Sequence, residues 1–227
     1  MKKSLSSFQS AEEMAEATAA NLSQAAASSA YELFCDKEFR RLAGLELMSQ
    51  VEQDRIFNEL VVAFLVLIML VLEAPDLRVA EDLRGYLRDL TKRVGQAYVK
   101  NLASLGIQAN HLGDWEKLID MRYDEYVRDK HEVRAAAMKL ESAEKSLDLD
   151  GLAQIQLLVP VQTVAIGCHK HVCRGHTDGK DELFKEVLKS LSRFYAELRI
   201  RLEGGKITPL TRARVAVKRA LRRLGKK

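Results

Sequence analysis

The residues most suited to chemistry in this chain lie together in one stretch, C-H-K-H-V-C-R-G-H, which runs from Cys168 to His176. Imidazole nitrogen and thiolate sulfur are ligands that suit zinc and copper. On a continuous helix His169, Cys173 and His176 would share one face, because they follow one another at i, i+4 and i+7. These three residues are the candidate metal ligands. One hypothesis for function is therefore a metal-dependent or redox helical-bundle enzyme or sensor that uses this cluster.

The same stretch also has a plainer interpretation. Its spacing is not C-x-x-C, and no second pair of ligands occurs elsewhere in the sequence at matching spacing. Histidines near the C-terminal end of a helix interact favourably with the negative end of its dipole, and small thiols behind them would fill a core. We therefore favour a helix end over a metal centre, and we expect no cofactor.

Common catalytic signatures are missing from the sequence. It has no nucleophile elbow, no Walker loop, no G-x-G-x-x-G and no H-E-x-x-H. A di-iron carboxylate bundle needs Glu-x-x-His on two helices, and none of the five histidines has a glutamate three residues before it. These observations favour a binding module over an enzyme.

Two glutamates flank the most apolar stretch of the chain, which is residues 60–72. A buried carboxylate with a raised pKa at Glu59 or Glu73 would be a candidate functional group. Because each glutamate stands where the apolar run stops, we expect instead that they mark its exposed ends.

The strongest charge feature is at the C-terminal end. Residues 206–227 hold nine of the 36 Lys and Arg residues and none of the 32 Asp and Glu residues, which leaves residues 1–205 with 27 basic and 32 acidic residues, a net charge of −5. Thr208 and Pro209 form a typical helix start, so we predict a basic helix over 209–224. Its thin apolar stripe consists of Leu210, Ala213, Val217, Ala220 and Leu224. The residues expected to contact an acidic partner are Arg212, Arg214, Lys218, Arg219, Arg222, Arg223, Lys226 and Lys227.

Three partners suit this basic helix. Nucleic acid is favoured as an external partner, because arginine outnumbers lysine in the helix and its guanidinium forms forks with phosphate. Docking on the acidic body of the same chain, or on another subunit, is a second possibility, with the apolar stripe as a packing seam. A membrane surface fits least, because interfacial helices usually carry Trp, Phe or several Leu residues on the apolar face.

The element that must position these groups is the apolar run of thirteen residues, 60–72. A membrane helix needs about 20 such residues, and this run rises only about 20 Å as a helix, so we expect no transmembrane insertion. Buried strands are usually about 4–8 residues long, which favours a helix here. A helix that is apolar on all sides must be covered on all sides. We therefore predict it at the centre of a bundle or in a subunit interface.

Apolar residues at helical spacing predict about six helices. These cover about 10–35, 36–73, 76–105, 115–146, 150–175 and 178–203, with loops between them that include 106–113. Pro160 is expected to kink or break the fifth helix, Asp178 to cap the sixth, and Tyr126 and Leu140 to lie on the buried stripe of the fourth. The fold class is therefore all-α, an antiparallel helical bundle over residues 10–203 followed by the C-terminal basic amphipathic helix in 206–227.

The first predicted helix is unusually rich in alanine and serine over residues 11–30. Side chains this small let helices approach closely but bury little area. We expect this helix to need a partner within the chain or from another copy, and we predict self-association through it, giving a homo-oligomer.

The composition is that of a soluble globular protein, with 47% hydrophobic and 30% charged residues. Three cysteines do not form a disulfide framework, and reduced thiols suit the cytoplasm. The two N-terminal lysines are not followed by the apolar segment of a signal peptide. We therefore expect a cytoplasmic, non-catalytic helical binding or scaffolding module that uses its basic C-terminal helix on an acidic partner.

Overall fold

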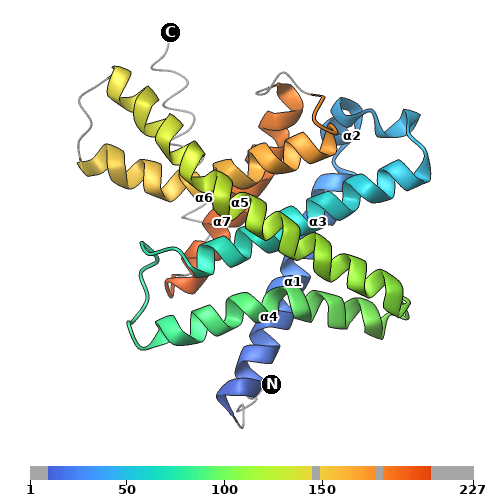
Figure 1. The fold of residues 1–227 in the computed structure, drawn as a ribbon, viewed down its shortest axis with the longest axis horizontal. Helices are drawn as coiled ribbons and strands as arrows, with labels where there is room; N and C mark the ends of the chain where they lie inside the picture. The colour runs from blue at the N-terminus through green and yellow to red at the C-terminus, as the bar shows by residue number, and fades with distance from the viewer. Residues whose placement is uncertain (1–9, 145–148, 177–180, 206–227) are drawn as a thin grey trace, which may run out of the picture.

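All regular structure that the computed structural model describes is helical (Figure 1). The described residues are 10–144, 149–176 and 181–205. Within them the elements are α1 (Ala11–Cys35), α2 (Lys37–Ala43), a short 3₁₀ helix η1 (Leu45–Leu47), α3 (Gln50–Leu72), α4 (Leu83–Ser104), α5 (Ala109–Glu144), α6 (Leu149–Val172) and α7 (Glu182–Leu202). The helices from α3 to α6 run in alternating directions in Figure 1. The predicted all-α, antiparallel bundle is therefore confirmed.

The centre of the bundle is α3. Residues 60–72 are all buried, with none more than 7% exposed, and α1, α4, α5, α6 and α7 all contact this helix. In the described part of the chain, α3 alone has the length and apolar composition of a membrane-crossing helix, and 83% of its most apolar window is buried inside the protein. The apolar run is thus covered by five other helices of the same chain, as a helix without a polar face requires.

The small residues of α1 form its inner face. Ala15, Ala19, Ser23, Ala26 and Ala30 are buried, and α1 packs on α3 and α4. Because these side chains are short, α1 can lie close to both neighbours. These neighbours are partners for α1 within the chain, and self-association through this helix stays a prediction.

The structure divides the helix predicted over 36–73 into three elements. α2 ends at Gly44, whose φ of 68° is the left-handed conformation that glycine adopts without strain. After η1, the Ser49 hydroxyl accepts a hydrogen bond from the amide of Glu52 (3.4 Å) and starts α3. The prediction of one continuous helix was wrong. Apolar residues keep a helical spacing across the Gly44 C-cap and the Ser49 N-cap, so the spacing alone did not reveal the break.

Other helix starts also differ from the prediction. α4 begins at Leu83 rather than near Asp76. The turn before it is held by Arg84, which donates a hydrogen bond to the carbonyl oxygen of Leu77 (2.8 Å). α5 begins at Ala109, inside the predicted loop. At α4, hydrogen bonds from Arg84 to carbonyl oxygens of the preceding turn thus accompany a helix start that periodicity alone placed wrongly.

Pro160 lies inside α6 and does not end it, although the sequence predicted a kink or a break. Its neighbours Val159 and Val161 are each 1% exposed, so packing against the bundle keeps the helix continuous despite the hydrogen bond that proline removes. At the next helix the N-cap is Asp181, which accepts a hydrogen bond from an amide in the first turn of α7 (2.8 Å). The predicted cap, Asp178, lies outside the described residues.

The burial of α3 predicts the effect of a charge inside it. Val66→Asp should lower the free energy of unfolding by about 4 kcal/mol or more, because Val66 is fully buried and an unpaired carboxylate has no compensation there. Urea denaturation followed by circular dichroism measures this change. Val51→Asp is the matched control on the same helix, since Val51 is 75% exposed, and it should change the value by less than about 0.5 kcal/mol. A Val66→Asp protein that melts within about 2 °C of the parent would contradict a buried α3.

Candidate functional site

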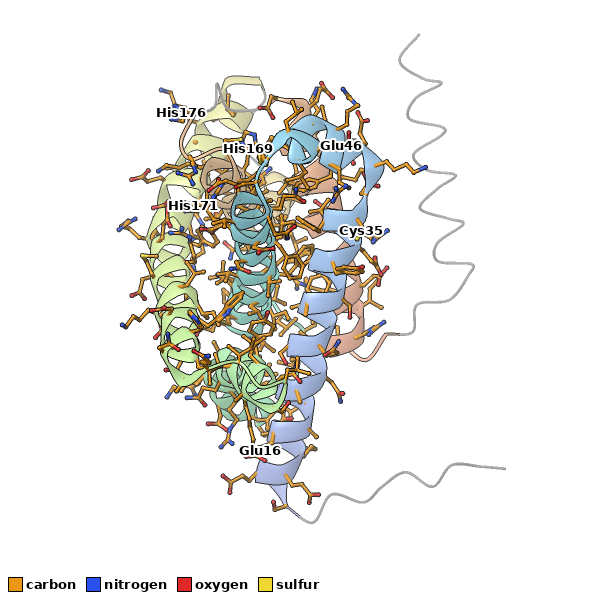
Figure 2. All side chains as sticks on the ribbon, turned by 90° about the vertical axis from the view of Figure 1, so that its right-hand side faces the viewer. Glu16, Cys35, Glu46, His169, His171 and His176 are labelled. Atoms are coloured by element: carbon orange, nitrogen blue, oxygen red, sulfur yellow. The ribbon has the colours of Figure 1, made fainter. Side chains whose placement is uncertain are left out.

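The structure does not bring the three candidate metal ligands onto one helical face. α6 ends one residue before Cys173, and the chain then turns through Arg174 (φ 53°) and Gly175 (φ 76°). His176 is exposed beyond this turn, whereas His169 is buried, and Figure 2 shows His176 at the outer edge of the molecule. Across the described residues, no group of three or more His, Cys, Asp or Glu side chains is placed to hold a metal ion.

Each of the two histidines on α6 lies beside a carboxylate from another helix. His169 Nε2 is 2.9 Å from Asp181 Oδ1 at the start of α7. His171 Nε2 is 2.8 Å from Glu125 Oε2 on α5. The His169 ring also packs edge-on against Phe184, with 5.7 Å between ring centroids. These pairings hold the C-terminal end of α6 between α5 and α7 and give both histidines a structural role.

The two cysteines of this stretch are poorly suited to form thiolates. Cys168 is fully buried, and burial raises the pKa of its thiol well above the usual value. Cys173 is half-buried, and burial raises its pKa in the same direction. The thiolate is the form that binds metals and attacks disulfides, so these shifts disfavour metal or redox chemistry here. The third cysteine, Cys35, is exposed and lies apart on α1 (Figure 2).

A network of buried charges joins α3, α5 and α6 beside these residues, and the sequence did not predict it. Both carboxylate oxygens of Glu59 accept hydrogen bonds from Arg122 (2.7 and 3.0 Å). Arg122 also donates to Glu125 Oε2 (3.2 Å), the oxygen that contacts His171. We expected Glu59 to mark an exposed end of the apolar run, but it is only 7% exposed. That prediction was wrong, because the partner that permits burial is 63 residues away in the sequence.

The glutamate at the other end of the apolar run behaves as expected. Glu73 is exposed and accepts a hydrogen bond from the Tyr123 hydroxyl (2.7 Å). Burial, together with this carboxylate, raises the pKa of the Tyr123 phenol. The two glutamates therefore have different roles, although their positions in the sequence look equivalent.

Arg55 on α3 caps the C-terminal end of α6. Its guanidinium donates to the carbonyl oxygens of His171 (2.8 Å) and Val172 (3.0 Å), which are among the acceptors that a helix end leaves without partners. Arg55 also bonds to Glu52 (3.0 Å), which pairs with Arg174 as well. Hydrogen bonds from Arg174 and Arg55 lower the pKa of the Glu52 carboxyl group. The end of α6 is thus fixed against the first turns of α3.

Tyr126 packs where α5 meets α6. Its side chain is fully buried, as predicted, and a Cβ atom at Gly167 would lie only 2.1 Å from its ring, so this position on α6 requires glycine. The Tyr126 hydroxyl has no hydrogen-bond partner in the described structure, and burial raises its pKa well above the usual value. The phenol therefore stays neutral and fills space. Together with the pair of Glu59 and Arg122, this packing joins α3, α5 and α6.

A second feature lies where α5 and α6 project together from the body (Figure 1). Six apolar side chains of these two helices are 36% to 63% exposed, namely Met138, Leu140, Leu152, Leu157, Leu158 and Ile166. A cleft of about 300 Å³ opens between the two helices, and we call it the α5–α6 cleft. It is lined by Ala137, Leu140, Gly151, Ile155, Leu158 and Gln162, together with Gln154. Leu140 was predicted on the buried stripe of the fourth helix, but it is 63% exposed, so that prediction was wrong.

The basic residues expected to bind an acidic partner, all within 206–227, lie outside the described residues. The structure does describe where this segment is attached. α7 ends at Leu202, and Arg199 near its end donates hydrogen bonds to Asp76 (2.5 Å) and Glu203 (2.7 Å). These bonds fix the end of α7 to the turn between α3 and α4, so the basic segment starts from a defined place on the body.

Compared with known proteins, the chain matches no protein-family model, no curated protein and no solved structure.

The buried network predicts a large asymmetry between two glutamate substitutions. Glu59→Ala should lower the free energy of unfolding by about 3 kcal/mol, because it leaves the Arg122 guanidinium in a buried place without its main partner. Glu38→Ala is the control, since it removes an exposed pair with Arg41, and such pairs contribute less than about 1 kcal/mol. Urea denaturation measures both. Equal losses for the two variants would show that Glu59 is not buried in solution.

The different burial of the cysteines predicts selective labelling. In the native protein at neutral pH, iodoacetamide should modify Cys35 readily and leave Cys168 unmodified, because Cys168 is fully buried and its thiol pKa is raised. Peptide mass spectrometry after a short pulse measures the two sites, with urea-unfolded protein as the control in which all cysteines react. Native labelling of Cys168 as fast as Cys35 would contradict the described packing of α6.

Proposed function

We propose that this chain is a non-catalytic helical binding module that contacts a polyanion, with nucleic acid favoured, through its C-terminal basic residues. The observation that carries the proposal is the separation of charge along the chain. Residues 206–227 hold nine basic and no acidic residues, whereas residues 1–205 carry a net charge of −5. A body with the same sign of charge as nucleic acid repels it, so the C-terminal segment is the attractive surface.

Nine of the fourteen arginines in residues 1–205 are engaged within the body, which supports this assignment. Eight of them form ion pairs with carboxylates of the described residues, namely Arg41, Arg55, Arg93, Arg122, Arg128, Arg174, Arg193 and Arg199. Arg84 instead donates to backbone carbonyl oxygens before α4. Guanidinium groups held in this way are neutralised or occupied by the chain itself, whereas the segment 206–227 contains no acidic residue that could neutralise its own arginines.

The residue types in the basic segment favour phosphate as the recognised group. The predicted helix 209–224 contains five arginines and one lysine, and guanidinium forms two parallel hydrogen bonds with a phosphate group. Contacts to phosphate carry no base sequence. We therefore expect binding that tolerates any sequence and weakens steeply as salt increases.

Two earlier hypotheses receive less support. Self-association through α1 is not part of the proposal, because its small-residue face is buried against α3 and α4. The metal or redox hypothesis loses its geometric basis, because His169, Cys173 and His176 do not share a face in the described structure.

A salt titration tests the proposal. Binding of fluorescent duplex DNA and of single-stranded RNA to the full chain is measured by anisotropy between 50 and about 300 mM KCl. If about five cationic side chains engage phosphates of duplex DNA, log K should fall against log salt with a slope of about −4 to −5. Replacing the five arginines of 209–224 with glutamine should abolish the salt-sensitive binding.

The matched control replaces the same five arginines with lysine, which keeps the charge and removes the fork. This variant should retain a similar salt slope at lower affinity. An intact protein without salt-sensitive affinity for DNA or RNA would refute the proposal. Stronger binding to anionic phospholipid vesicles than to nucleic acid at the same salt concentration would reassign the polyanion to a membrane surface.

A further inference from the structure

The exposed side of α4 is basic, although the body as a whole is acidic. Residues 83–113 hold five Arg or Lys residues and one acidic residue, Asp89. Three of the basic residues, Arg88, Lys92 and Lys100, are exposed on α4. Because residues 1–205 carry a net charge of −5, this helix forms a local region of opposite sign, and such a region attracts anions.

The exposed residues of this side follow one another at intervals of four. Arg88, Lys92, Gln96 and Lys100 are all exposed, and we call these four residues the α4 face. At this spacing they fall within about a third of the helix circumference, and the face is about 18 Å long. That length corresponds to about five phosphates of one DNA strand, which follow one another at about 3.4 Å along the duplex axis. The amide of Gln96 is also a group that donates to phosphate oxygens.

The three cations of the α4 face are not neutralised by the body. The acidic residue of this helix, Asp89, pairs with Arg93 (2.7 Å), and Arg93 also lies 3.7 Å from Glu12 of α1. Within the described residues, no ion pair involves a cation of the α4 face. Their charges therefore remain available to an anion from outside the chain, unlike those of most arginines in the body.

The C-terminal basic segment is attached beside the start of α4. Arg199, near the end of α7, donates to Asp76 (2.5 Å) in the turn before α4. Arg84, in the first turn of α4, donates to the carbonyl oxygen of Leu77 (2.8 Å) in the same turn. Arg88 lies one helical turn beyond Arg84. Figure 1 shows the end of α7 and the start of α4 on the same side of the molecule, from which α4 crosses the body.

We propose that the α4 face is a second contact surface for nucleic acid, and that it binds phosphates of the same molecule that the C-terminal basic residues contact. This inference rests on the proposed function, from which it takes the polyanion. Three cations alone are too few to hold nucleic acid at physiological salt. The α4 face therefore adds affinity to binding by the segment 206–227 and orients the nucleic acid along the helix.

The residue types of this surface favour nucleic acid over a lipid surface. Over residues 88–101, every exposed side chain of α4 is charged or polar. Helices that lie in a membrane interface bury an apolar face with Trp, Phe or Leu, and this side of α4 has none to insert. Phosphate contacts instead need only cations and amide donors at the surface.

A charge-reduced variant of the full chain tests the inference. Arg88→Gln, Lys92→Gln and Lys100→Gln are combined, and binding of duplex DNA and of single-stranded RNA is measured by anisotropy over a range of KCl concentrations. With three phosphate contacts on α4 and five from the C-terminal arginines, the slope of log K against log salt should be about −7 for the intact protein. In the α4 variant the slope should become about −4 to −5. Its melting temperature should stay within about 2 °C of the parent, because the replaced side chains are exposed.

The matched control removes the same three charges from other helices. Arg128→Gln, Lys139→Gln and Lys170→Gln change exposed residues of α5 and α6, so this variant has the same net charge as the α4 variant. It should keep a slope of about −7, because the two variants differ only in where the charges are removed.

Each outcome decides a different point. Equal slopes for the α4 variant and its control would overturn the inference and leave the proposed function intact. Binding that survives replacement of the five arginines of 209–224, but is lost in the α4 variant, would refute the proposed function and keep the α4 face as the contact surface. An intact protein without affinity for DNA or RNA would overturn both. Affinity for anionic phospholipid vesicles that depends on the α4 face, together with DNA affinity that does not, would overturn nucleic acid as the partner of this face.

Discussion

The burial of α3 on every side is the constraint on which the rest of the structure depends. Thirteen consecutive residues without a polar side chain have no favourable place at a surface that faces water. The other long helices must therefore contact them, and α1, α4, α5, α6 and α7 all do so. The same requirement accounts for the small inner face of α1, because short side chains let a helix approach two neighbours closely where larger ones would hold it away.

Apolar packing specifies little about how each helix is rotated or shifted along its neighbour, and the buried polar contacts add that information. The carboxylate of Glu59 accepts two hydrogen bonds from Arg122, and Arg55 caps the last carbonyl oxygens of α6. The net stability gained from such a buried pair is small, because removing both charges from water costs nearly as much as their attraction returns. We infer that these contacts serve mainly to fix α5 and α6 on α3. Tyr126 against Gly167 does the same through shape.

The body and the C-terminal segment differ in the sign of their net charge. The body satisfies many of its charges internally, through pairs such as Arg199 with Asp76 and Glu203, and it retains a negative net charge. The segment 206–227 concentrates positive charge.

The sequence by itself determined the features that depend on composition and local spacing, namely an all-α fold, the buried run 60–72 and the basic segment 206–227. The helix break at Gly44 was also visible in local residue types, but an uninterrupted apolar spacing concealed it. Only the tertiary structure decided that Glu59 is buried, that the two histidines of α6 face carboxylates on different helices, and that Leu140 is exposed. The physical reason is that burial of a charge, or exposure of an apolar side chain, depends on partners far away in the sequence. Periodicity within one helix carries no information about them.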